Sequence, residues 1–186
     1  MYSTFSQINL IHIKMSSDSV ITVVSLISST IIALVSIRYA NKNNRQQIRT
    51  GGLEELYQAI QILSRHYGIF KELWFKVQQL RDSDDKELRT LEQYYQLRDQ
   101  KFPDANREKV SNLLSRIEVL AECYTTGELK SKILKYETLM YSFYEFVFQA
   151  GSIQQEIHFR AGYPDYEAFY LMVKELKEEI VKEIKV

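Results

Sequence analysis

The side chains best suited to bind a ligand lie in one short stretch, Ile157 to Tyr166, which reads IHFRAGYPDY. A guanidinium such as that of Arg160 can bind a phosphate or a carboxylate through two parallel hydrogen bonds. His158 supplies a second cationic donor, and the ring of Tyr163 offers a surface on which a base can stack. We therefore expect a site for a small anionic ligand here, with His158 and Arg160 as the anion contacts.

The same stretch can also be an ordinary loop between two apolar helices. In that interpretation Asp165 caps the helix that follows, because a carboxylate at this position accepts a hydrogen bond from a free backbone N–H. Outside this stretch, His66 and Lys71 are further candidates for contact with an anion. The residue types alone leave both interpretations open.

The sequence contains no signature of catalysis or of metal binding. The histidines, His12, His66 and His158, are isolated, and none has a ligand partner one helical turn away. No glycine-rich phosphate loop is present, and the carboxylates stand beside lysines and arginines, as on a solvated helix face. We therefore predict that the protein is not an enzyme and that it needs no cofactor or metal.

The strongest structural signal is an apolar run, Val20 to Ile37, with the sequence VITVVSLISSTIIALVSI. It has no charge, Pro or Gly, and as a helix it is about 27 Å long, close to the thickness of the bilayer core. A signal peptide would carry its basic residues before the run and a small-residue cleavage site after it. A buried core helix would be expected to show a polar face. We predict a single transmembrane helix.

Basic residues follow this span and predict its orientation. Arg38, Lys42, Arg45 and Arg49 carry no acid among them, and basic flanks stay on the cytoplasmic side. Thr50-Gly51-Gly52 is the clearest break in the chain and a predicted hinge. The expected organisation is an extracytoplasmic tail (1–19), a span (20–37), a basic stalk with hinge (38–52) and a cytoplasmic helical domain (53–186). The sequence leaves open whether translation begins at Met1 or at Met15.

Small residues mark one side of the span. Ser25, Ser29 and Ala33 are spaced by four, and Thr22, Ser29 and Ser36 are spaced by seven. Small residues at such spacing let two membrane helices approach closely, which predicts a homo-oligomer. Two alternatives remain open: the hydroxyls line a pore, or they bond to carbonyl groups of their own helix.

The rest of the chain predicts an all-α domain of about five helices and no strands. Pro and Gly are scarce, at 2 and 6 residues, which is typical of helices with few loops. Leu53 to Leu80 is predicted as one helix, because its apolar residues alternate steps of three and four. The members of that seam are Leu53, Leu56, Ile60, Leu63, Tyr67, Phe70, Trp74 and Val77.

Four further helices follow from the same periodicity. The segment 86–101 is polar, with Leu91 and Tyr95 on its inner side, and Asn106 to Tyr124 has a clear apolar face. Leu129 to Ala150 is apolar nearly all round, which predicts the core helix of the bundle. Tyr166 to Ile184 closes the chain with an inner apolar stripe and an outer face of Lys and Glu.

Charge and cysteine content limit the possible partners. The formal net charge is 0, which argues against DNA binding. The single cysteine, Cys123, rules out an internal disulfide and fits a reducing cytoplasm. It lies within an apolar helical run, so we expect it to be buried and inert.

The layout resembles that of small single-span bacterial membrane proteins with a cytoplasmic helical domain. The resemblance rests on VITVVSLISSTIIALVSIRYANKNNR followed by a wholly helical domain, and loosely on LMYSFYEFVFQAGSI. It implies a location in the bacterial inner membrane. Some proteins with this layout act in anti-phage defence, including CRISPR-associated effectors gated by cyclic oligoadenylates. The resemblance assigns no binding residues.

Two hypotheses for the function follow. In the first, the protein is a self-associating effector in the lipid bilayer, and binding of a cytoplasmic protein or of a small anion such as a cyclic oligonucleotide changes its action at the membrane. A ligand can drive such a change only if it binds one state better than the other. In the second, the protein is a passive scaffold that tethers a cytoplasmic partner.

Overall fold

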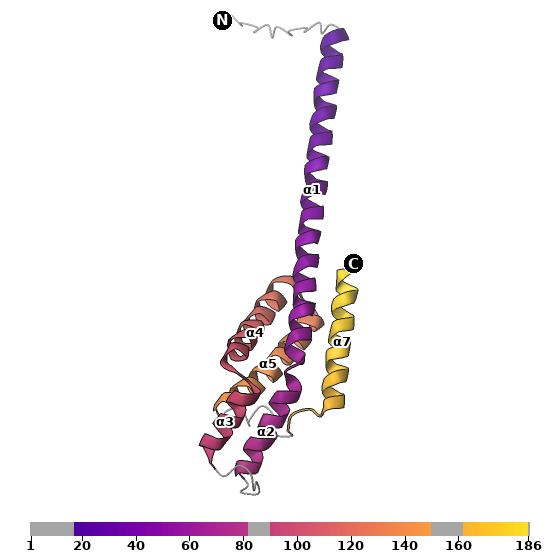
Figure 1. The fold of residues 1–186 in the computed structure, drawn as a ribbon. Helices are drawn as coiled ribbons and strands as arrows, with labels where there is room; N and C mark the ends of the chain where they lie inside the picture. The colour runs from indigo at the N-terminus through magenta and orange to yellow at the C-terminus, as the bar shows by residue number, and fades with distance from the viewer. Residues whose placement is uncertain (1–16, 82–89, 150–161, 186) are drawn as a thin grey trace, which may run out of the picture. The chain divides into compact units, whose positions relative to one another are not determined.

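The computed structural model describes residues 17–81, 90–149 and 162–185, and all regular structure in these ranges is helical. The prediction of an all-α chain is confirmed for this part of the protein. The helices, labelled in Figure 1, are α1 (Ser17–Ser64), α2 (Tyr67–Arg81), α3 (Leu91–Lys101), α4 (Asp104–Tyr124), α5 (Gly127–Gln149) and α7 (Tyr166–Ile184).

The chain divides into two compact units, Met1–Gln47 and Ile48–Val186. In the described part of the first unit, the large apolar side chains from Val24 to Ile37 are between 49% and 67% exposed. Within the described residues, α1 is the one helix long and apolar enough to cross a membrane. The predicted apolar N-terminal helix is therefore confirmed, with an apolar surface that no other described element covers.

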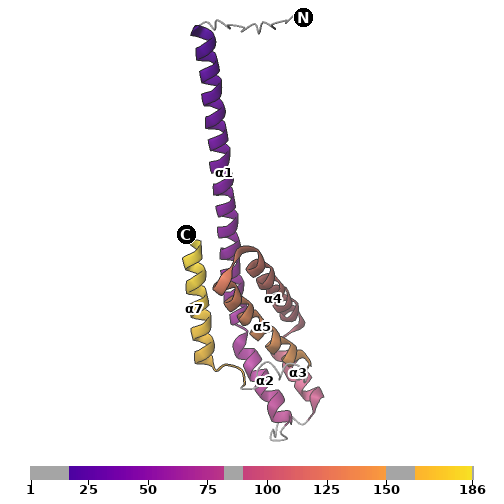
Figure 2. The ribbon, with the colours of Figure 1, turned by 180° about the vertical axis from the view of Figure 1, so that it is seen from behind.

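The second unit has its own core, built around α5. This helix packs against α2, α4 and α7, and α3 packs against α2. Seen from both sides, α5 lies among these helices (Figures 1 and 2). The prediction that the apolar segment from Leu129 forms the core helix is confirmed. The largest fully buried side chains are aromatic: Tyr67, Phe70, Tyr94, Phe102, Tyr136, Phe143 and Phe146.

The predicted single helix from Leu53 to Leu80 is two helices. α1 ends at Ser64, α2 begins at Tyr67, and the turn between them is closed by the His66 N–H, which donates to the Leu63 carbonyl at 3.0 Å. The apolar seam continues through this break, but Leu73 is fully buried and Trp74 only half-buried. The predicted seam therefore holds on both sides of the turn, except that Leu73 takes the buried position that was expected for Trp74.

The predicted break at Thr50-Gly51-Gly52 is wrong, because α1 is helical through these residues. Gly51 and Gly52 have different surroundings. A Cβ at Gly51 would meet no atom within 4 Å, whereas a Cβ at Gly52 would lie 2.7 Å from Cγ of Tyr124. Gly52 is therefore the point at which the ring at the end of α4 packs directly on the backbone of α1.

Two predictions of burial are also wrong. Cys123 is exposed, because the buried face of α4 carries Leu120 and Ala121 and turns Cys123 outward. In α3 the predicted inner residues, Leu91 and Tyr95, are both exposed, and the buried side chain is Tyr94, whose hydroxyl donates to the Val147 carbonyl of α5 at 2.7 Å. Tyr94 and Tyr95 are adjacent and of the same type, so the local sequence does not show which of the two is buried.

Candidate functional site

Two of the predicted ligand contacts, His158 and Arg160, lie outside the described residues. The third, Tyr163, packs into the aromatic core of the second unit. Its ring lies face to face with Phe143, with centroids 3.5 Å apart, and meets Trp74 edge-on at 5.6 Å. One face of this ring is thus already covered by protein and is not open to a base.

The carbonyl of Pro164 anchors the segment that leads into α7. The Tyr67 hydroxyl and the Lys71 ammonium both donate to this oxygen. One residue later, the Asp165 carboxylate accepts from the Ala168 N–H at 2.8 Å, so the predicted cap of the last helix is confirmed. Lys71 therefore has a structural partner in the position where we considered an anion contact.

His66 lies in the turn between α1 and α2 and is half-buried. Its ring meets Phe102 edge-on with centroids 5.4 Å apart and also lies near Phe70. Burial lowers the pKa of His66, and the nearby charge of Lys109 lowers it further. A neutral imidazole that packs against an aromatic ring is a poor receptor for an anion. The aromatic side chains around His66 also differ from those around Tyr163.

The predicted self-association residues of the span, Thr22, Ser25, Ser29, Ala33 and Ser36, are all exposed on α1. The hydroxyls of Ser25 and Ser29 donate to carbonyls one turn back, those of Thr22 at 3.3 Å and Leu26 at 2.9 Å. This is the intrahelical bonding that we left open as an alternative. It leaves the small-residue face intact, since a hydroxyl folded onto its own helix adds little bulk.

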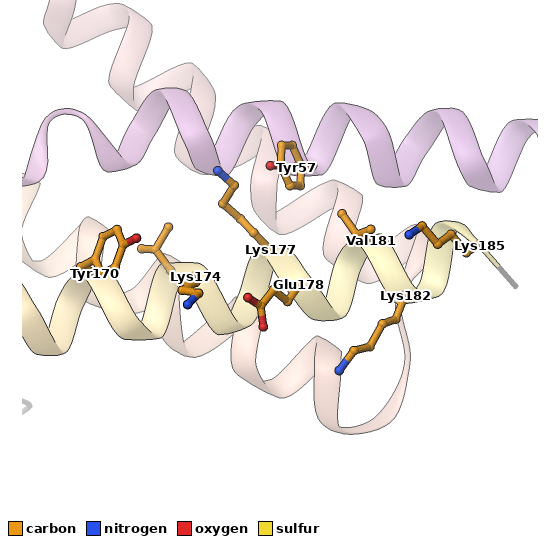
Figure 3. Close-up of a pocket in the computed structure, with 9 residues that line it drawn as sticks. Tyr57, Tyr170, Lys174, Lys177, Glu178, Val181, Lys182 and Lys185 are labelled. Atoms are coloured by element: carbon orange, nitrogen blue, oxygen red, sulfur yellow. The ribbon is translucent and has the colours of Figure 1, made fainter.

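The most distinctive surface feature is a groove of about 500 Å³ between α7 and the part of α1 that belongs to the second unit. We call it the α7 groove, and Figure 3 shows its lining. Its apolar walls include Tyr57, Tyr170, Val173 and Val181, and a single acid, Glu178, lies among its charges. Its other lining residues are four lysines: Lys174, Lys177, Lys182 and Lys185.

One groove lysine already has a partner on α1. The Lys177 ammonium lies 4.6 Å from the centroid of the Tyr57 ring, and in Figure 3 it points toward that ring. A cation over an aromatic face is attracted by the negative charge density of the ring. For Lys174, Lys182 and Lys185, no ion pair with an acidic side chain is present within the described residues. The groove is therefore electropositive.

Ion pairs hold the middle and the C-terminal end of α7. Near the C-terminus the Arg49 guanidinium pairs with Glu183. In the middle, Lys132 of α5 binds Glu179 at 2.6 Å and Glu175 at 2.9 Å, and these hydrogen bonds raise the pKa of Lys132. These acids of α7 are thus engaged with Lys132 and Arg49, and Lys182, which forms no ion pair within the described residues, also lies close enough to Glu175 to lower the pKa of that carboxyl.

Sequence reasoning missed the α7 groove. The lysines were expected on the outer face of the last helix, and Tyr57 is not a member of the predicted apolar seam. The available signal was weak: Lys174, Lys177 and Lys185 alternate with Val173 and Val181 on one side of α7. More than a hundred residues separate Tyr57 from Tyr170, so only the packing of the two helices brings them together.

A second hollow, between α1 and α4, has mixed charge. Glu55 and Arg116 lie at its edge and form a two-pronged ion pair at 2.6 and 2.8 Å. The guanidinium lowers the pKa of Glu55. In the part of the chain that the structure describes, no three His, Cys, Asp or Glu side chains gather to hold a metal ion.

Comparison of the chain with protein-family models, with curated proteins and with solved structures finds no match.

Proposed function

We propose that this chain is a membrane-anchored, self-associating effector whose helical unit binds a partner or a small anionic ligand on the cytoplasmic side of the membrane. The observation that carries this proposal is the contrast between two parts of one chain. The apolar side chains from Val24 to Ile37 are exposed, whereas those after Leu53 form a separate core. An uncovered apolar helix of this length is best accommodated by lipid.

The α7 groove supports the binding of an anion. Its lysines outnumber its acids by four to one, and their charges face an apolar wall. Such a combination is typical of sites that hold amphiphilic anions, because the apolar wall excludes water and strengthens the attraction between opposite charges. A role in anti-phage defence, gated by a cyclic nucleotide, is the finer form of this proposal and derives from the resemblance in layout.

The native cysteine provides the test of topology. Cys123 is exposed on α4, so a membrane-impermeant maleimide can reach it wherever α4 faces the reagent. With the helical unit in the cytoplasm, we expect no labelling of intact spheroplasts and full labelling after permeabilisation. The protein should also remain in the membrane pellet after extraction with alkaline carbonate.

A variant with its cysteine before the span is the matched control. Ser17→Cys in a Cys123→Ser background moves the only thiol to the other side of the apolar run. We expect this variant to be labelled in intact spheroplasts. Labelling of wild-type Cys123 in intact spheroplasts would contradict the orientation, and release by carbonate would contradict the anchoring.

A further inference from the structure

The α7 groove has an excess of positive charge, and two of its lysines lie at its C-terminal end. Lys182 and Lys185 flank Glu183, whose carboxylate is paired with Arg49. Lysines at the C-terminal end of a helix are also stabilised by the helix dipole, but that effect requires neither a groove nor an apolar wall. The charges therefore belong to a surface that a second molecule can occupy.

The covalent chain keeps this end of the groove within reach of the membrane. Arg49 is the twelfth residue after Ile37, the last residue of the predicted span, so the two lie at most about 40 Å apart along the chain. The intervening residues add Arg38, Lys42 and Arg45. Clusters of basic residues just cytoplasmic of a span are typical binding sites for acidic lipids.

The composition of the lining favours a lipid over a soluble nucleotide. Among the described residues that line the groove there is no Ser, Thr, Asn or Gln side chain, so few of these groups could read the edge of a base. Lysines present point charges without the fixed geometry of a guanidinium. Lys174 and Lys185 are spread over about 16 Å of helix, a length that suits a lipid headgroup with its first acyl carbons better than one small anion.

We propose that the α7 groove binds the headgroup of an acidic phospholipid such as phosphatidylglycerol. In this assignment Lys182 and Lys185 hold the phosphate, and the wall formed by Tyr57, Val173 and Val181 packs against the glycerol and the first acyl carbons. The assignment names the anion of the proposed function and rests on the proposed membrane anchoring.

The test measures lipid binding by the full-length protein in a non-ionic detergent. Native mass spectrometry during titration with phosphatidylglycerol and with phosphatidylcholine gives the affinity of each lipid. We expect bound phosphatidylglycerol, little bound phosphatidylcholine, and about 25-fold weaker binding of phosphatidylglycerol by Lys182→Gln/Lys185→Gln, since each lysine near a phosphate surface contributes about fivefold. Both lysines are exposed, so the variant should keep its fold.

A charge-matched variant separates the groove from general electrostatics. Lys109→Gln/Lys135→Gln removes two exposed lysines from other faces of the same unit and should bind like the wild type. Equal binding by the groove variant and the wild type would overturn the assignment, as would equal binding of the two lipids. Displacement of phosphatidylglycerol by micromolar adenosine monophosphate would assign the groove to a soluble nucleotide instead. None of these results affects the carbonate extraction, which tests the anchoring separately.

Discussion

Glu137 is an acid on the most apolar helix of the second unit. It lies half-buried on α5, and burial, with a smaller contribution from the charge of Glu118, raises its pKa to about 7. In an unfolded chain the same carboxyl has a pKa near 4.5. Between these two values the folded protein holds a proton that the unfolded chain releases, so the stability of the fold must decrease as the pH rises through this window.

Glu137→Gln should remove this pH dependence. Glutamine has the same shape and carries no charge, so the variant should be more stable than the wild type at pH 8 by about 1–2 kcal/mol and similar to it near pH 4.5. Thermal unfolding can be followed by the fluorescence of Trp74, the only tryptophan, which contacts Tyr163. Glu118→Gln, at an exposed position, should change the profile much less. If the stabilities of Glu137→Gln and the wild type change with pH in the same way, water solvates the Glu137 carboxylate in the folded protein.

At the scale of the elements, direct backbone contacts and ion pairs join helices that are distant in sequence. α1 meets α4 at Gly52 and Tyr124 and again through Glu55 and Arg116. α7 is joined to α5 by the Lys132 network. Exposed ion pairs contribute little to stability one by one, so the close packing at Gly52 should matter more than the Glu55 pair.

Gly52→Ala and Gly51→Ala form a matched pair of substitutions in one helix turn. Alanine favours a helix by up to about 1 kcal/mol over glycine, so Gly51→Ala, with open space around it, should stabilise the second unit. Gly52→Ala places a methyl group inside the Tyr124 ring and should destabilise the unit by about 1–3 kcal/mol. Melting temperatures of the two variants in detergent provide the comparison.

A third variant tests whether the ring of Tyr124 causes the destabilisation expected for Gly52→Ala. Tyr124→Ala removes the ring that the new methyl group would strike, so Gly52→Ala should cost little in that background. If Gly52→Ala and Gly51→Ala stabilise the protein equally, the ring of Tyr124 moves freely and the contact does not restrain α1.

At the scale of the whole molecule, the chain joins an exposed apolar helical segment to a unit that folds around its own core. The core residues all lie between Leu53 and Ile180, within the second unit. Changes in the span should therefore leave the helical unit intact. This independence makes the proposed self-association of the span separately testable.

Ser25→Leu/Ser29→Leu/Ala33→Leu should weaken self-association by about tenfold while leaving membrane insertion unchanged, because bulky side chains prevent close approach of two helices. Cross-linking of the full-length protein in its native membrane measures the change. The matched control, Val24→Leu/Ile31→Leu/Val35→Leu, alters the opposite side of the helix and should associate like the wild type. Equal cross-linking of the two triple variants would contradict the role of the small-residue face.

The sequence by itself determined the features that depend on neighbouring residues. The all-α class, the apolar N-terminal helix, the core character of α5 and the start of α7 after Asp165 all follow from periodicity and capping. These signals are local, because a helix repeats every 3.6 residues and its cap lies within one turn.

Only the tertiary structure decided which residues meet across the unit. The turn at His66, the packing of Gly52 on Tyr124 and the exposure of Cys123 depend on partners far away in the chain. The α7 groove arises in the same way, from Tyr57 on α1 and lysines on α7. The physical reason is that burial is a property of paired surfaces, and the periodicity of one helix does not specify which other helix covers it.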